Sequence, residues 1–132
     1  MLYLLPLKTF IMSVQTTQQV ADRFHELSQQ GQFDQIQDEL YAGNCVSIEP
    51  ANAPGMQSVE GLAAIKEKGK NFNSMVEEMH GGYSKEPQVA GNHFSVAMGM
   101  DVTFKGQPRM NMDEIAVYEV KDGKIVKEQF FY

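Results

Sequence analysis

A carboxylate that closes a short apolar run is the first feature with chemical meaning. Glu49 ends the segment "LYAGNCVSIE" and is followed at once by Pro50, which biases the Glu49 backbone toward an extended conformation. A carboxylate at a strand end beside a loop can be shielded from water and still be reached by a ligand. Such a group can abstract a proton next to a carbonyl. The alternative is a surface glutamate paired with a lysine.

Asp113 is the second candidate, within the segment "PRMNMDEIAVYEV". Successive side chains of a strand point to opposite faces, so alternation puts Asp113 on one face with Ile115 and Val117. We expect that face to point inward, where the loss of water would keep the carboxyl group neutral. The alternative is an aspartate that caps a neighbouring backbone group or pairs with Arg109.

Composition excludes several other classes of function. The chain has 132 residues, a formal net charge of −6 and no cluster of Lys and Arg, so we expect neither nucleic acid nor a membrane as a partner. Cys45 is the single cysteine and the three histidines are scattered, so we predict no metal site and no cofactor. Phosphate-binding and serine-nucleophile motifs do not occur in the sequence. A chain that needs no disulfide fits a cytoplasmic location.

The hydrophobic periodicity predicts three helices followed mainly by strands. Thr16 and Gln19 have the spacing of a capping box, Gly31 suits a helix end, and Ser58 suits a helix cap. The expected helices cover residues 17–30, 33–40 and about 59–76, and the expected strands cover residues 46–50, 80–89, 93–104, 108–120 and 124–132. We therefore predict an α+β domain over residues 12–132, with three N-terminal helices packed on an antiparallel sheet. Residues 1–11 are expected to form an N-terminal extension.

Three segments carry a resemblance to a known superfamily: "LYAGNCVSIEP", "VEGLAAIKEK" and "VYEVKDGKIVKEQFFY". From Thr17 to Tyr132 the chain resembles the nuclear transport factor 2-like fold, and within it the SnoaL-like and ketosteroid isomerase-like proteins. The resemblance implies a curved sheet wrapped against the helices as a cone with an internal cavity. It also implies a homodimer formed through the sheet.

The resemblance assigns roles to individual residues. Glu49 matches the catalytic carboxylate of ketosteroid isomerases, and Asp113 matches the protonated aspartate that donates to the developing oxyanion. Their oxyanion-binding tyrosine is matched by Phe24, which has no hydroxyl group. The residues expected to bind substrate are Phe24, Tyr41, Met98, Met100, Glu128, Phe130 and Tyr132.

We therefore interpret the chain as a domain that binds a small apolar or carbonyl-containing molecule. If it is an enzyme, the expected chemistry is proton transfer next to a carbonyl, as in an isomerase or a cyclase. The alternative is a ligand carrier or a protein-interaction module without catalysis, and a third reading is a cone filled by its own large side chains.

Overall fold

The computed structural model describes residues 14–53 and 55–132. The predicted boundary between an extension and the domain, at residues 11 and 12, lies outside the described residues. The elements follow in the order α2 (Thr17–Gln29), α3 (Phe33–Leu40), β1 (Tyr41–Ile48), β2 (Val59–Glu60), α4 (Leu62–Met75), β3 (Val76–Ser84), β4 (Gln88–Ala90), β5 (His93–Phe104), β6 (Arg109–Lys121) and β7 (Lys124–Phe131).

The first two helices agree with their predicted bounds to within one residue. The hydroxyl of Thr16 accepts the Gln19 N–H at 3.1 Å, and the Gln19 side chain accepts the Thr16 N–H at 2.9 Å, so the predicted capping box is confirmed. The chain leaves α2 through Gly31 at a φ of +70°, a conformation that favours glycine. Local signals were therefore enough to set both ends of α2.

The third helix begins later than predicted, because the residues expected to open it form strand β2 instead. Ser58 does not cap α4; its hydroxyl accepts the backbone N–H of Glu49 at 2.9 Å. The start of α4 is attached to β1 through Gly61, whose N–H donates to the Cys45 carbonyl at 2.8 Å. These two bonds hold the loop and the first turn of α4 beside the end of β1.

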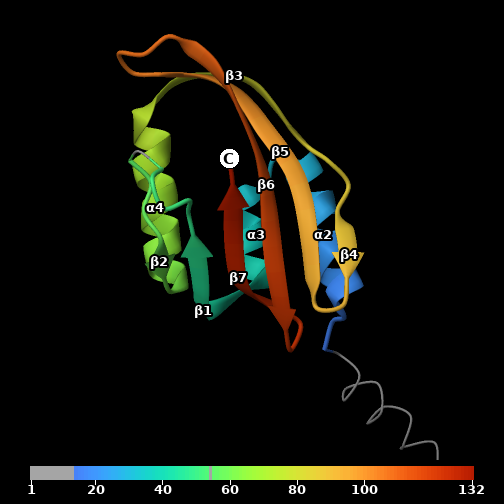
Figure 1. Cartoon of the computed structure of the whole chain (residues 1–132). Helices are drawn as coiled ribbons and strands as arrows, with labels where there is room; N and C mark the ends of the chain where they lie inside the picture. The colour runs from blue at the N-terminus through green and yellow to red at the C-terminus, as the bar shows by residue number, and fades with distance from the viewer. Residues whose placement is uncertain (1–13, 54) are drawn as a thin grey trace, which may run out of the picture.

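The strands form one open sheet in the order β2-β1-β7-β6-β5-β3, with β4 paired to β5 (Figure 1). Strands β1 and β7 run parallel, with Ser47 opposite Glu128, whereas the other pairs are antiparallel. The α+β class is confirmed, but the predicted antiparallel sheet is corrected to a mixed one. The hairpins of the β5–β6–β7 meander set the direction of β7. Strand β1, which is far from β7 in the sequence, pairs with it through the tertiary fold.

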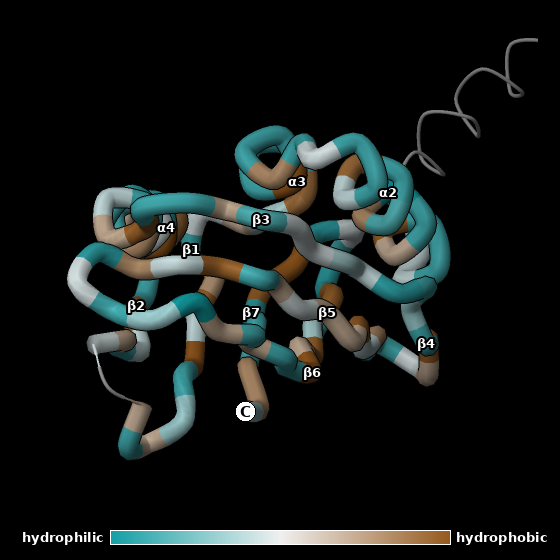
Figure 2. Tube along the Cα trace, turned by 90° about the horizontal axis from the view of Figure 1, so that it is seen from above, coloured by the Kyte–Doolittle hydropathy of each residue, from teal (hydrophilic) through white to brown (hydrophobic). Residues whose placement is uncertain are grey.

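The core lies between the sheet and the helices, which line one side of the strands in Figure 2. Phe24 of α2 meets Phe94 of β5 and Tyr118 of β6, with ring centroids 5.5 Å and 4.8 Å away. Phe94 and Tyr118 stack at 4.9 Å. All three rings are buried, so this end of the domain is filled by its own aromatic side chains.

Candidate functional site

Glu49 lies at the centre of a buried polar cluster. Only 7% of the residue is exposed, although it carries a carboxylate. Its Oε2 atom is 2.7 Å from Lys68 Nζ, and its Oε1 atom accepts the hydroxyl of Tyr132 at 2.7 Å. Both carboxylate oxygens are therefore bonded, as a buried charge requires. The expectation that Glu49 is shielded from water is confirmed.

Lys68 is the cation of this cluster, and no candidate set drawn from the sequence contained it. It lies on α4, two turns after the bond between Gly61 and β1, and this spacing brings its ammonium group to the end of β1. Lys68 Nζ also donates to Ser47 Oγ at 2.7 Å and lies 5.6 Å from the centroid of the Phe130 ring. The sequence signal was the segment "VEGLAAIKEK", which indicated the fold but no role for the lysine.

Glu128 is the second buried carboxylate, with 4% of the residue exposed. The hydroxyl of Tyr41, itself buried, donates to Glu128 Oε1. Burial raises the pKa of Glu128, while the bond from Tyr41 and the charge of Lys68 oppose the rise. Two sequence-predicted residues, Tyr41 and Glu128, are thus brought together next to the Glu49 pair.

Glu114 is the third carboxylate, and sequence reasoning missed it. It lies half-buried on β6, opposite Met98 of β5. Burial, and then the charges of Glu49 and Glu128, raise the pKa of Glu114 from 4.5 to about 7. A carboxyl group with this pKa can both accept and return a proton near neutral pH.

Asp113 does not point inward, so its predicted orientation is wrong. It is exposed and accepts the hydroxyl of Tyr83 at 2.7 Å, and its neighbour Ile115 is 51% exposed. The inward face carries Glu114, Ala116 and Tyr118 instead. Alternation could not choose between the faces, because both carry apolar residues. Tyr118 decides the choice, since its ring packs with the aromatic core.

The remaining predicted ligand-binding residues divide between core and site. Phe24 is 3% exposed within the aromatic core and faces no groove. Met98 and Met100 are half-buried on β5. Phe130 lies under the Lys68 ammonium group, and Tyr132 bonds Glu49. Only the last two reach the Glu49–Lys68 pair.

A groove of about 400 Å³ runs between α4 and the loop before β2. Polar and apolar side chains contribute about equally to its lining: Gly55, Met56, Gln57, Val59, Ala64, Glu67, Lys68, Asn71, Phe72 and Met75. Lys68 belongs to both the groove and the polar cluster. A molecule in the groove could therefore place a polar group against the Glu49–Lys68 pair.

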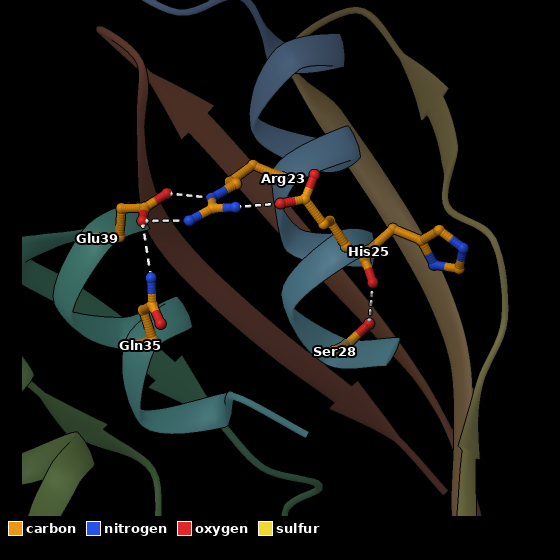
Figure 3. A network of polar contacts seen from close by, with 6 residues as sticks. Arg23, His25, Ser28, Gln35 and Glu39 are labelled. Carbon is orange, nitrogen blue, oxygen red and sulfur yellow. Dashed lines mark hydrogen bonds and ion pairs between the residues drawn. The ribbon is translucent and has the colours of Figure 1, made fainter. Parts of the chain in front are cut away.

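A second polar network, between α2 and α3, belongs to the scaffold (Figure 3). Arg23 Nε and a terminal guanidinium nitrogen bond the two oxygens of Glu39 at 2.6 Å and 2.9 Å. The bond from Arg23 lowers the pKa of Glu39 from 4.5 to about 2. The network joins the two helices near the surface, so it stabilises their packing.

Neither a metal centre nor a membrane span can be recognised in the part of the chain that the structure describes. Residues 14–53 and 55–132 contain no group of three His, Cys, Asp or Glu side chains placed to hold one metal ion. None of the helices described is long and apolar enough to cross a membrane.

Comparisons with known proteins agree with this architecture. The sequence profile of the SnoaL-like domain matches residues 15–132. A crystal structure from Mesorhizobium loti, of a candidate SnoaL-like polyketide cyclase also described as a carbohydrate phosphatase, is 34% identical at a TM-score of 0.83. That similarity covers 89% of this chain and 100% of the other.

Two more distant structures share the fold. A nuclear transport factor 2-like protein of unknown function from Burkholderia pseudomallei is 13% identical at a TM-score of 0.71, over 88% of this chain and 89% of the other. TerC, co-crystallised with polyporic acid, is 15% identical at a TM-score of 0.70, over 88% of this chain and 90% of the other. The search of curated proteins gave no match.

Proposed function

The chain belongs to the SnoaL-like domain family, and from that premise we propose that it binds a small, partly apolar carbonyl compound and moves a proton next to the carbonyl. The reaction class is that of an isomerase or a cyclase. The observation that carries the proposal is Glu114, whose pKa is raised to about 7 beside the buried Glu49–Lys68 pair. The candidate polyketide cyclase from Mesorhizobium loti supports the same class of chemistry.

In the proposed reaction Glu114, as a carboxylate, takes a proton from the carbon next to the carbonyl. The electron pair of that C–H bond forms a C=C bond, and the π pair of the carbonyl moves to its oxygen, which gives an enolate. Lys68 has three N–H donors, and its described bonds to Ser47 and Glu49 use two of them, so one can stabilise the enolate oxygen. Glu114 then returns the proton to the same or a conjugated carbon.

The proposal modifies the role of Glu49 and gives up the role of Asp113. Glu49 was expected to be the base, but both of its oxygens are bonded, so its arrangement suits a residue that holds Lys68 in place. The role expected of Asp113, which lies on the exposed face, was to stabilise the oxyanion, and it passes to Lys68, while Glu114 takes the role of base. Glu49→Gln is still expected to abolish turnover, because Lys68 would lose its anionic partner.

Deuterium exchange tests the proposal without knowledge of the natural substrate. We would incubate 2-tetralone, a flat enolisable ketone, in D₂O at pD 7 and follow the loss of its α-proton signals by NMR. We expect the protein to accelerate exchange and Glu114→Gln to remove the acceleration. Glu119→Gln, on the same strand but outside the cluster, is the matched control. Acceleration that survives in Glu114→Gln would contradict the assignment.

A second candidate function is a ligand carrier or interaction module without catalysis. The observation that favours it is the aromatic core of Phe24, Phe94 and Tyr118, which fills the interior and leaves the groove at the side of α4. Binding of 2-tetralone without exchange would support the carrier. A cytoplasmic location, which the buried free thiol of Cys45 suits, would serve either function.

We also propose a homodimer formed through the face of the sheet that the helices leave uncovered. Tyr83, Ile115 and Phe131 are between 45% and 51% exposed, and the register β5–β6–β7 aligns the last two. Exposed apolar side chains on one face suit contact with a second copy. Light scattering on the purified chain is expected to give twice the monomer mass, and Ile115→Glu to reduce it. A monomeric mass for the unaltered chain would refute the dimer.

A further inference from the structure

We propose that the phenol of Tyr132 occupies the place of a ligand hydroxyl, and that an aromatic ligand carrying its own O–H donor displaces it from Glu49. This inference rests on the proposed function, because it names the class of molecule that the Glu49–Lys68 site accepts. It adds a contact by which the chain competes with its own ligand.

The contact itself is well defined. The Tyr132 hydroxyl donates to Glu49 Oε1 at 2.7 Å, while Lys68 bonds Oε2. The carboxylate is buried, so each oxygen depends on a donor supplied inside the site. Tyr132 therefore supplies one of the two donors that make the burial of Glu49 tolerable.

Tyr132 lies at the edge of the cluster. It follows the last residue of β7, and 51% of it is exposed. Tyr41 offers the contrast within the same cluster, because it also donates to a buried carboxylate but is only 7% exposed. Moving Tyr41 would open the core, whereas moving Tyr132 would uncover less apolar surface. Tyr132 is thus the tyrosine of this cluster that a ligand can exchange.

The chemistry of a ligand that replaces Tyr132 follows from the Glu49 carboxylate, which stays buried. If Tyr132 moves away, Glu49 Oε1 keeps its burial and loses its donor, which is unfavourable unless the ligand brings another. A ketone, an ether or a hydrocarbon offers no donor, whereas a phenol or an enol does. A ring with a hydroxyl group reproduces the tyrosine side chain, and its remaining part can extend past Lys68 into the groove along α4.

The experiment measures dissociation constants by titration calorimetry for two matched probes, 4-ethylphenol and 4-ethylanisole, which differ in whether the oxygen carries a proton. Tyr132→Phe removes the competing hydroxyl and keeps the ring. We expect it to bind 4-ethylphenol about tenfold more tightly, since a hydrogen bond to a charged group is worth roughly one decade in affinity. In the unaltered chain 4-ethylphenol should bind more tightly than 4-ethylanisole, which brings no donor to Glu49.

Tyr83→Phe is the matched control, because Tyr83 is also half-exposed and donates to a carboxylate, that of Asp113 on the outer face. It should leave both dissociation constants unaltered. Adding Glu49→Gln to Tyr132→Phe should abolish the gain, because the acceptor charge is then lost. Tyr132→Ala, which also removes the ring, should retain it.

The outcomes separate the inference from the proposed function. If 4-ethylphenol binds the unaltered chain and Tyr132→Phe binds it equally or less tightly, the displacement is refuted while the binding site stands. Equal affinity of the unaltered chain for 4-ethylphenol and 4-ethylanisole would also refute it, because the donor would then be irrelevant. If no variant binds either probe while 2-tetralone still exchanges its protons, the ligand class is wrong and the acid–base function stands. Failure of both refutes both.

Discussion

Glu114→Gln should stabilise the protein above pH 7 and have little effect below pH 4.5. The folded state raises the pKa of Glu114 from 4.5 to about 7. Below pH 4.5 the group is protonated in both the folded and the unfolded chain, so it costs no stability. As the pH rises toward 7 the unfolded chain loses the proton first, and the free energy of unfolding falls. Above pH 7 the loss is complete and constant.

The size of the effect follows from the same two pKa values. A rise in the pKa from 4.5 to about 7, at about 1.4 kcal/mol per pKa unit, sets an upper bound of about 3 kcal/mol. Glu114 is half-buried, so solvent screens part of this energy. We expect Glu114→Gln to raise the free energy of unfolding at pH 8 by about 1–2 kcal/mol. A functional residue that lowers the stability of the fold commonly behaves in this way when it is replaced.

Urea unfolding followed by far-UV circular dichroism gives the two free energies needed, at pH 4 and at pH 8. The quantity to compare is the difference between Glu114→Gln and the unaltered chain at each pH, because Glu128 also titrates in both proteins. Glu119→Gln is the control for a change of charge on β6. A difference that is the same at pH 4 and pH 8, or a variant less stable at pH 8, would refute the reasoning.

Three further changes are tested by urea unfolding at pH 7, two in the buried polar cluster and one on the outer face of the sheet. Lys68→Met leaves Glu49 buried without its cation and should lower the free energy of unfolding by about 3–5 kcal/mol. Adding Glu49→Gln should recover much of that loss. If the effects of the two substitutions simply add, the pairing is contradicted. Tyr41→Phe removes the donor to the buried carboxylate of Glu128 and should cost about 1–3 kcal/mol, and a neutral effect would show the bond to be dispensable. Gly99→Ala places a methyl group 2.6 Å from a carboxylate oxygen on β6 and should cost about 1–3 kcal/mol; unchanged stability would mean that the strands can shift to admit it.

The sequence was most informative where structure depends on neighbours along the chain. The capping box at Thr16, the helix 33–40 and the strand 93–104 follow from spacing alone, and the structure has all three. The inward face of β5 was also predictable, because Val96 and Val102 alternate with small or polar residues and are buried. Glu49 could be singled out because the segment "LYAGNCVSIEP" resembles the one that carries the catalytic carboxylate of ketosteroid isomerases.

The partners of Glu49 could not be read from the sequence, because they come from distant elements. Lys68 meets Glu49 only because α4 is attached to β1, and Tyr132 meets it only because β7 lies parallel to β1. Those contacts are set by packing across the fold and leave no periodic signal. The parallel pairing itself was missed for the same reason.

The choice between Asp113 and Glu114 was also made by tertiary structure. Period-two alternation fixes which residues share a face but not which face is inside, and here both faces of β6 carry apolar side chains. The packing of Tyr118 against Phe24 and Phe94 turned Glu114 inward. The sequence by itself thus determined most of the elements, the fold class and two carboxylates of the cluster, Glu49 and Glu128. Only the folded chain decided which groups surround those carboxylates, because their approach depends on packing between residues far apart in the sequence.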